Sequence, residues 1–233
     1  MLELKNISYS VIDENQNNID ILKDVNIKFD KGINVITGQN GSGKSTLVKL
    51  IMDINKPTSG KIKYNNKDIT SLSISERANL GFTIAFQQPV RFKGIKVKDL
   101  LDIASSENNK LADACGYLSK AGLCAKDYLN RELDNTLSGG ELKRIELSIA
   151  LAKGGEVFLF DEPEAGIDLW SFDSLINLFK NLNDKIVIIV SHQEKIIKCA
   201  NKVILLDNDN VKEYSSAKAI ANIKKQQCGK LGG

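Results

Sequence analysis

A glycine-rich octapeptide near the N-terminus contains the residue types that bind polyphosphate groups. Residues 38–45 read Gly-Gln-Asn-Gly-Ser-Gly-Lys-Ser and fit the pattern of a glycine, four residues and then Gly-Lys-Ser. Glycines let backbone N–H groups converge on phosphate oxygens, and the N-terminus of the following helix adds its dipole. Lys44 would offset the charge of the β- and γ-phosphates, and Ser45 would bind Mg²⁺. The loop by itself leaves kinases, GTPases and transport ATPases open.

Two neighbouring carboxylates follow an apolar segment further along the chain. Residues 157–160 read Val-Phe-Leu-Phe and precede Asp161 and Glu162. Adjacent residues of a strand point their side chains in different directions, so the two carboxylates can have separate tasks. Asp161 suits a Mg²⁺ shell, and Glu162 suits orienting or deprotonating an attacking water. Without the upstream loop, an acidic loop at a strand end would be the better interpretation.

Two more positions could bind an anion. His192 is the single histidine of the chain and follows an apolar segment at 185–190. Because α/β sheets bind ligands at the carboxyl ends of their strands, we expect His192 to contact the γ-phosphate. Residues 137–141, Leu-Ser-Gly-Gly-Glu, precede a predicted helix and would form a second anion-binding helix N-terminus. A plain helix cap at Ser138 explains the same residues equally well.

The segments that must position these residues predict an α/β fold. Continuously apolar segments alternate with amphipathic ones, which favours a mainly parallel sheet covered on both faces. An alternating pattern over 1–30 predicts an antiparallel β subdomain, and apolar residues at 3–4 spacing over 96–137 predict helices. We expect strands at 33–37, 61–64, 81–86, 157–160, 185–190 and, as the last strand, 202–206, and helices at 44–52, 142–152 and 168–182.

Taken in this order, the motifs resemble the nucleotide-binding domain of the ATP-binding cassette (ABC) superfamily, a P-loop NTPase. The resemblance implies a mainly parallel core sheet, an antiparallel β subdomain at the N-terminus and an inserted helical subdomain at about 96–152. It extends to about residue 214, so we expect a cassette at 1–215 and a tail at 216–233. It also implies ATP and Mg²⁺ as cofactors and hydrolysis of ATP to ADP and phosphate.

The resemblance assigns each motif a role. Residues 38–45 correspond to the Walker A loop, 137–141 to the signature motif and 158–162 to the Walker B strand. The expected catalytic residues are Lys44, Gln87 of the Q-loop, Glu162 and His192 of the switch region; the expected Mg²⁺ ligands are Ser45, Gln87 and Asp161. The expected ATP-binding residues are Tyr9, which would stack on adenine, Gly38, Gln39, Asn40, Gly41, Ser42, Gly43, Lys44, Ser45, Thr46, Ser138, Gly139, Gly140, Glu141 and the D-loop residue Asp168.

In this family two cassettes meet head to tail. The resemblance therefore implies an ATP-dependent homodimer, in which Ser138 and Gly140 of one chain contact the γ-phosphate held by the Walker A loop of the other. One chain would then contain only half of each site.

Three segments resemble the SufC-type ATPase of iron–sulfur cluster assembly. They are residues 85–95, 141–146 and 162–168, which carry a Pro-Val pair, a Glu/Lys-Arg/Glu pattern and an acidic residue with glycine. On this basis we expect a SufB- or SufD-like scaffold as the partner. Pro163 and residues 149–151 are instead typical of transporters. The alternative is the nucleotide-binding subunit of an ABC membrane transporter, with residues 88–100 docking a membrane subunit.

Composition narrows the remaining classes. Lys and Arg exceed Asp and Glu by only three, which is too few to indicate a nucleic-acid partner. The apolar runs are far shorter than the roughly 20 residues that cross a bilayer, and the N-terminus does not resemble a signal peptide. We therefore expect a cytoplasmic protein that does not itself insert into a membrane.

Overall fold

A six-stranded sheet forms the core of the protein. The computed structural model describes residues 1–88, 90–105, 112–207, 210–216 and 220. The strand order is β12-β11-β3-β10-β9-β6, and every pair except β11–β12 is parallel. Its strands are β3 (Gly32–Thr37), β6 (Phe82–Ala85), β9 (Val157–Asp161), β10 (Ile186–Val190), β11 (Lys202–Asp207) and β12 (Asn210–Tyr214). Strands β3, β9 and β10 are buried along their whole length, as expected for strands covered on both faces.

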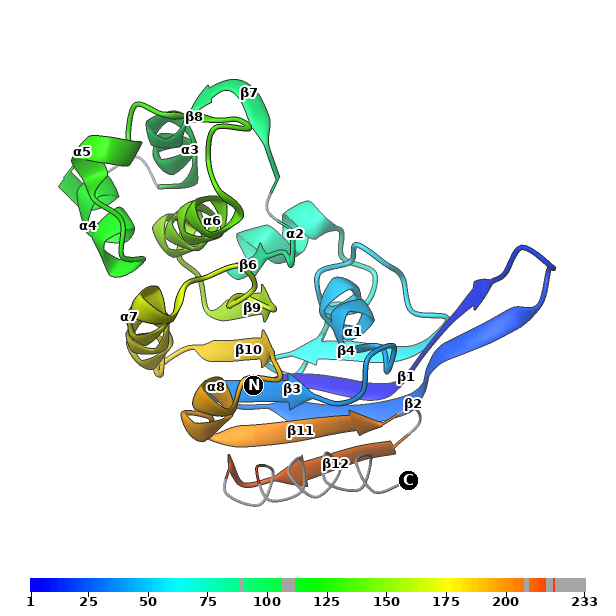
Figure 1. Cartoon of the computed structure of the whole chain (residues 1–233). Coiled ribbons are helices and arrows are strands. Elements are labelled where there is room, and N and C mark those ends of the chain that lie inside the picture. Colours follow the sequence, from blue (N-terminus) through cyan, green and yellow to red (C-terminus); the bar gives the residue numbers. More distant parts are fainter. Residues whose placement is uncertain (89, 106–111, 208–209, 217–219, 221–233) are drawn as a thin grey trace.

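A second, antiparallel sheet covers one face of the core. It has the order β2-β1-β4-β5, and the ends of β1 and β2 project from the body as a hairpin arm (Figure 1). Helix α1 (Lys44–Ile51) buries Leu47 and Val48 in an apolar core that both sheets share. The strands are β1 (Leu2–Ile12), β2 (Asn18–Phe29), β4 (Ser59–Tyr64) and β5 (Lys67–Asp68).

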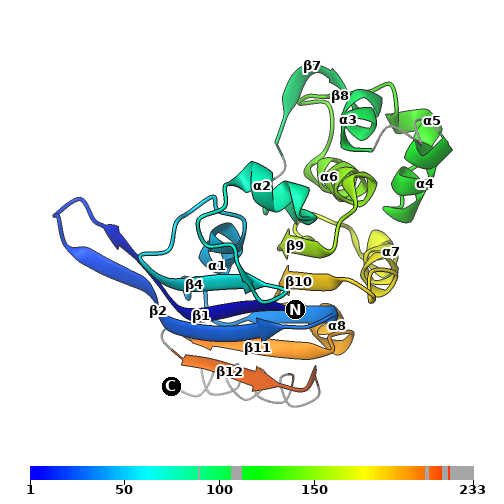
Figure 2. The ribbon, with the colours of Figure 1, turned by 180° about the vertical axis from the view of Figure 1, so that it is seen from behind.

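Helices α6 (Gly139–Lys153), α7 (Leu169–Lys180) and α8 (Glu194–Lys198) cover the other face of the core sheet. Helix α6 packs Leu147 and Ala150 against the sheet and Leu142 and Ile145 against a third apolar core. That third core belongs to a separate group of elements, which Figure 2 shows as a lobe on the side of β9 away from β10. The lobe contains β7 (Phe92–Lys96), α3 (Val97–Ala104), α4 (Ala112–Lys120), α5 (Ala125–Tyr128) and β8 (Glu132–Leu133).

The predicted fold class is confirmed, but several elements differ from the sequence expectations, and the sequence does not predict β5, α2 (Ile74–Asn79) or α8. The segment 202–206 is not the last strand, because β12 follows it antiparallel at the sheet edge. The short β7–β8 pair connects the segment just before the expected helical insertion with a segment inside it, and the sequence does not predict either strand. Helix α6 begins at Gly139, not at 142. Short or polar edge strands have weak hydrophobic periodicity, which explains the missed pairings of β5, of β12 and of β7 with β8. The predicted domain boundary at 215 stays a prediction, and the predicted tail lies almost entirely outside the described residues.

Among the residues that the structure describes, no helix combines the length and the apolar character needed to cross a membrane.

One buried arginine holds the end of α1, the helix that follows the glycine-rich loop. Arg77 lies on α2 (Ile74–Asn79) and is 0% exposed. Its guanidinium donates to the carbonyl oxygens of Leu50 and Ile51 at 2.8 Å, and it pairs with Asp53 at 3.5 Å. The last carbonyls of a helix have no intrahelical partner, so a buried cation there satisfies them and complements the helix dipole.

Replacing this arginine tests its contribution to stability. We expect Arg77→Met to lower the free energy of unfolding by about 3–5 kcal/mol, because it leaves the Asp53 carboxylate and two helix carbonyls without their partner. Urea denaturation measures the change. The exposed Arg91 offers a matched control, and Arg91→Met should change the same quantity by less than about 0.5 kcal/mol. Equal effects of the two variants would contradict the assignment.

Candidate nucleotide-binding and hydrolysis site

The register of the parallel strands brings the predicted site residues to one edge of the sheet. Val190 at the end of β10 pairs with Asp161 at the end of β9 and with Ile36 near the end of β3. The Ser191 backbone N–H continues this pairing by donating to the Ile36 carbonyl at 3.1 Å. The glycine-rich loop, the two carboxylates and the His192 segment therefore begin side by side.

The loop conformation depends on its glycines. Gly38 has φ +151°, and a Cβ there would overlap the carbonyl oxygen of Leu206. Gly43 has φ +87°, and a Cβ there would lie 2.6 Å from Leu22 Cδ2. Helix α1 starts at the next residue, so its free N–H groups face the loop. This geometry forms an anion-binding helix N-terminus.

Lys44 lies folded onto the loop. Its Nζ donates to the carbonyl oxygens of Gly38 at 3.2 Å and Gln39 at 2.6 Å. Burial lowers the pKa of Lys44, while the charges of Glu162 and Asp161 oppose that shift. The ammonium group is thus held near the carboxylates. Inside the loop, the Ser42 hydroxyl is buried without a hydrogen-bond partner, which leaves it available to a bound group.

A cavity of about 550 Å³ lies beside the loop. Its lining brings together residues that are widely separated in the sequence, from the loop, the end of β6 and the end of β9. The residues that line it are Ile21, Asn40, Gly41, Gly43, Lys44, Ser45, Thr46, Gln87 and Glu162. Apart from Ile21, all of these are residues that the sequence predicted.

Two oxygen donors that suit a cation meet beside this cavity: Ser45, which lines it, and Asp161, which does not. The Ser45 hydroxyl donates to Asp161 Oδ1 at 3.0 Å, and Asp161 is only 4% exposed. Burial raises the pKa of Asp161, against the opposing hydrogen bond from Ser45. A buried carboxylate beside a hydroxyl is the kind of oxygen-donor set that Mg²⁺ uses. These residues therefore fit the predicted metal.

Glu162 leaves the strand in an unusual backbone conformation. Its φ of +46° lies in the left-handed region, which is uncommon for a residue with a side chain. Its backbone N–H donates to the Val190 carbonyl at 3.0 Å, and its carboxylate accepts a hydrogen bond from Gln87 Nε2 at 2.6 Å. Strained backbone of this kind is concentrated at functional sites. The contact places Gln87 and Glu162 in one site, as the sequence predicted.

His192 follows β10 at the same edge. Its Nδ1 lies 3.5 Å from the Thr37 hydroxyl, immediately before the loop. Its pKa lies below the usual value, because partial desolvation and the Lys44 charge both disfavour the imidazolium, although Glu162 opposes them. A neutral ring at physiological pH can still donate one hydrogen bond and accept another.

Glu164 contacts the segment that carries His192 through Ser191. The Ser191 hydroxyl donates to Glu164 Oε1 at 2.5 Å and accepts from the Gln193 backbone N–H at 3.0 Å. Burial raises the pKa of Glu164, against the hydrogen bond from Ser191. Glu164, the acidic residue noted in the segment 162–168, therefore helps to hold the segment that carries His192.

The signature residues form the start of α6 and do not line the cavity. Ser138 and Glu141 make a reciprocal capping box, in which each side chain accepts from the other's backbone N–H. Gly140 lies so close to the Gly166 carbonyl that a Cβ would overlap it. Asp168 caps α7 by accepting from the Ser171 N–H at 2.9 Å. One chain therefore does not bring Ser138, Gly139, Gly140, Glu141 or Asp168 to its own cavity.

Sequence reasoning missed one residue of the cavity and leaves another prediction open. Ile21 lines the cavity, and no motif had indicated it. Tyr9 is half-buried against the core shared by the two sheets and is not among the residues that line the cavity, so its stacking on adenine stays a prediction. Its register partner is Leu22, the residue after Ile21. Strand pairing thus connects the predicted residue with the segment that lines the cavity.

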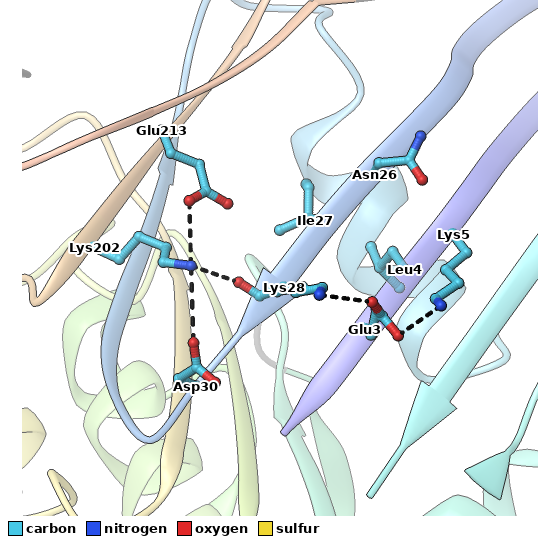
Figure 3. A pocket seen from close by; sticks show the side chains of 9 residues that line it. All are labelled: Glu3, Leu4, Lys5, Asn26, Ile27, Lys28, Asp30, Lys202 and Glu213. Atoms are coloured by element: carbon cyan, nitrogen blue, oxygen red, sulfur yellow. Dashed lines mark hydrogen bonds and ion pairs between the residues drawn. The ribbon is translucent and has the colours of Figure 1, made fainter. Parts of the chain in front are cut away.

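A second cavity, of about 480 Å³, lies between β1, β2 and the β11–β12 edge (Figure 3). Its charged side chains neutralise one another. Glu3 pairs with both Lys5 and Lys28 at 3.3 Å, and Lys202 pairs with Glu213 at 3.3 Å and Asp30 at 4.0 Å. This network connects the two sheets. We interpret it as a structural contact between them and not as a binding site.

Comparisons with known proteins agree with this geometry. The family model described as ABC transporter matches residues 22–165. The uncharacterized ABC transporter ATP-binding protein MJ0035 of Methanocaldococcus jannaschii is 38% identical over 227 residues, covering 91% of this chain and 90% of the relative. The probable ATP-dependent transporter ycf16 of Trieres chinensis is 30% identical over 236 residues, covering 93% of this chain and 92% of the relative.

A solved structure has the same fold. The dimeric ATP-binding cassette MJ0796, in a post-hydrolysis state bound to ADP and Pi, has a TM-score of 0.84 and 25% sequence identity; the match covers 93% of this chain and 99% of that one. The matched family segment exceeds half of the chain. The chain therefore belongs to the ABC transporter family as an ATP-binding cassette, and its activity is that of an ATPase.

The capping box of Ser138 and Glu141 should make the free energy of unfolding depend on pH. The hydrogen bond from the Tyr128 hydroxyl at 2.6 Å, together with the Ser138 N–H, lowers the pKa of Glu141 from 4.5 to about 2. The ionised carboxylate therefore stabilises the fold above about pH 4.5, and this contribution disappears as the pH falls toward about 2. We expect Glu141→Gln to cost about 1–2 kcal/mol of unfolding free energy at pH 7 and progressively less below pH 4.

Urea denaturation from pH 7 to pH 2.5 measures this difference. Glu14→Gln, at an exposed turn, is the control and should show no such trend. A destabilisation by Glu141→Gln that does not change with pH would rule out the charge of Glu141 as its cause.

Proposed function

We propose that this cassette binds Mg-ATP in the cavity beside the glycine-rich loop and hydrolyses it to drive a conformational change in a partner protein. The observation that carries the proposal is the convergence of Lys44, Ser45, Gln87 and Glu162 on one cavity, while the signature residues lie outside it. The cavity thus has the groups that hold phosphate and activate water, and it needs a second chain to be complete.

Each residue has a task that follows from its position. The N–H groups of the loop and of α1 bind the phosphate oxygens, and Lys44 moves from the loop carbonyls to the β- and γ-phosphates when these arrive. Glu162 accepts a proton from the attacking water or orients that water. Gln87 holds the Glu162 carboxylate, and the neutral His192 contacts the γ-phosphate.

Ser45 and Asp161 would hold the magnesium ion, with Gln87 nearby as a further ligand. Bound Mg²⁺ supplies charge neutralisation on the phosphate oxygens. The same oxygen donors are present whether or not the ion is bound, and Asp161 stays ionised more readily when a cation is beside it.

A second copy of the chain completes the site in this proposal. Ser138, Gly139 and Gly140 begin a helix whose N-terminus can bind an anion, and they lie outside the cavity of their own chain. A head-to-tail dimer would place them on the γ-phosphate of the partner's ATP. The solved relative MJ0796 is described as dimeric and bound to ADP and Pi, which supports this arrangement.

For the partner, we propose first that the cassette is the nucleotide-binding subunit of a membrane transporter, on its cytoplasmic side. The relatives MJ0035 and ycf16 are both described as transporter proteins. The segment 88–100, next to Gln87, would dock the membrane subunit. Phe92 in this segment is exposed, as a docking residue would be.

The second candidate is the SufC type, with a SufB- or SufD-like scaffold as partner. The resemblance rests on residues 85–95, 141–146 and 162–168, and the structure gives one charged residue in each of the last two segments a specific contact at the site. Glu164 supports the His192 segment through Ser191, and Lys143 contacts the backbone beside Gln87. These contacts favour a functional role for the residues that suggested the Suf pattern.

Removing the proposed base tests the hydrolysis mechanism. We expect Glu162→Gln to lower the turnover number for ATP at least about a hundredfold while ATP affinity stays within a few fold, because the amide cannot accept the proton. Phosphate release and calorimetric ATP titration measure the two quantities. The same variant should accumulate as an ATP-bound dimer in size-exclusion chromatography. Wild-type turnover would exclude Glu162 as the base, and Glu132→Gln, on β8, is the control.

Affinity purification from native cells distinguishes the two partners. If the cassette drives a transporter, it should be recovered with an integral membrane subunit from detergent-solubilised membranes. If it is of the SufC type, it should be recovered from the soluble fraction with a β-helical scaffold protein. Carrying the Glu162→Gln change in the bait should strengthen either complex, because ATP then stays bound. Recovery of a soluble scaffold alone would contradict the transporter proposal.

A further inference from the structure

An ion pair buried inside the protein contacts the backbone that carries Gln87. Lys143 lies on α6 and its side chain is 1% exposed; Glu146, one turn later on the same helix, is 16% exposed. Their charged groups are 3.2 Å apart. Residues three apart on a helix share one face, so both side chains reach the same neighbour.

That neighbour is the peptide of Phe86, the first residue after β6. Glu146 Oε1 accepts from the Phe86 N–H at 2.8 Å, and Lys143 Nζ donates to the Phe86 carbonyl oxygen. Lys143 Nζ also lies 3.5 Å from the Gln87 carbonyl oxygen. Two side chains of α6 thus hold both polar groups of Phe86 and reach the next peptide.

The position of β6 explains why these contacts matter. Among the residues that the structure describes, β6 is an edge strand that pairs with β9 alone, and its ladder ends with Ala85 opposite Phe160. In the described sheet the pairing ends at Ala85, so no strand pairs with Phe86. The ion pair takes the place of a strand partner, and it fixes the backbone one residue before Gln87.

A continuous set of contacts then connects α6 to the proposed base. Helix α6 begins at the signature residues, its Lys143–Glu146 pair holds Phe86, and the neighbouring Gln87 side chain donates to Glu162 at 2.6 Å. Burial raises the pKa of Glu146, and the Lys143 charge opposes that shift, as expected for a buried pair. A buried pair of this kind costs desolvation energy and is often no more stabilising than apolar residues, so stability alone does not account for it.

We propose that Lys143 and Glu146 are positioning residues for ATP hydrolysis: they hold the Phe86 backbone so that the Gln87 amide stays on the Glu162 carboxylate. Movement of α6 when its N-terminus binds a phosphate would be transmitted through this pair to Gln87. The inference rests on the proposed roles of Gln87 and Glu162, and it is independent of which partner the cassette drives.

The test replaces both charges together. In the full chain, the double variant Lys143→Met with Glu146→Leu removes the pair without leaving an unpaired buried charge, so it should fold, with a lower midpoint of thermal unfolding because the Phe86 N–H and carbonyl lose their partners. We expect its turnover number to fall about tenfold to a hundredfold, because the Gln87 amide is no longer held in place. The KM for ATP should stay within about twofold, because the phosphate loop is untouched.

A double-mutant cycle with Gln87 separates positioning from a purely structural role. If the pair acts through Gln87, the double variant should cause no further loss in a Gln87→Ala background. If the pair has only a structural role, its effect should persist in full there. Glu146→Gln, which keeps the side-chain shape, serves as a second variant should the double replacement fail to fold; it should lower turnover in the same Gln87-dependent way.

The same helix offers a matched control. Lys153 donates to the Phe82 carbonyl at 2.8 Å, at the opposite end of β6 from Gln87, and Lys153→Met should leave turnover unchanged. Wild-type turnover in the double variant, or a full additional loss in the Gln87→Ala background, would overturn the inference. Full activity of Gln87→Ala would overturn it as well. Failure of the hydrolysis proposal itself is recognised separately, because Glu162→Gln would then keep wild-type turnover.

Discussion

The site depends on the in-register parallel pairing of β3, β9 and β10. Because Val190 lies opposite both Ile36 and Asp161, the segments that follow the three strands leave the sheet at the same edge. A one-residue slip would send the following side chains to the opposite face. The three strands are buried on both faces, by α1 and the second sheet on one and by α6 to α8 on the other, and this close packing on both sides opposes a slip. Hydrophobic burial on both faces is thus what aligns the catalytic groups.

Charge is organised around this edge in two different ways. At the cavity, the Lys44 ammonium lies near the carboxylates of Asp161 and Glu162, a mixture of charges that suits the binding of a metal and a triphosphate. Behind the cavity, the positive charge of Lys143 is paired with Glu146 and directed at backbone carbonyls. The first arrangement binds a ligand, and the second holds the protein groups that act on it. Both rely on low solvent exposure, which strengthens each electrostatic contact.

Different parts of helix α6 have three different roles. Its first turn carries the signature residues, its middle contacts Phe86 through the ion pair, and its apolar residues divide between the core of the sheet and the core of the helical lobe. A helix that packs in two cores moves with both, so a ligand at its N-terminus can affect the position of the lobe relative to the sheet. In either proposed assembly, this would connect ATP binding to the partner through the segment next to Gln87.

The sequence alone predicted the fold class, and it indicated which groups would hold phosphate, because glycines, carboxylates and apolar strands have strong local signals. It placed Lys44 at the start of a helix and Asp161 and Glu162 at the end of a strand. It missed β12 and the β7–β8 pair, whose short segments depend on tertiary contacts for their pairing. It also missed Ile21 at the cavity. Only the tertiary structure decided that Lys143 and Glu146 contact Phe86, because residues 57 and 60 positions apart carry no periodic signal that relates them.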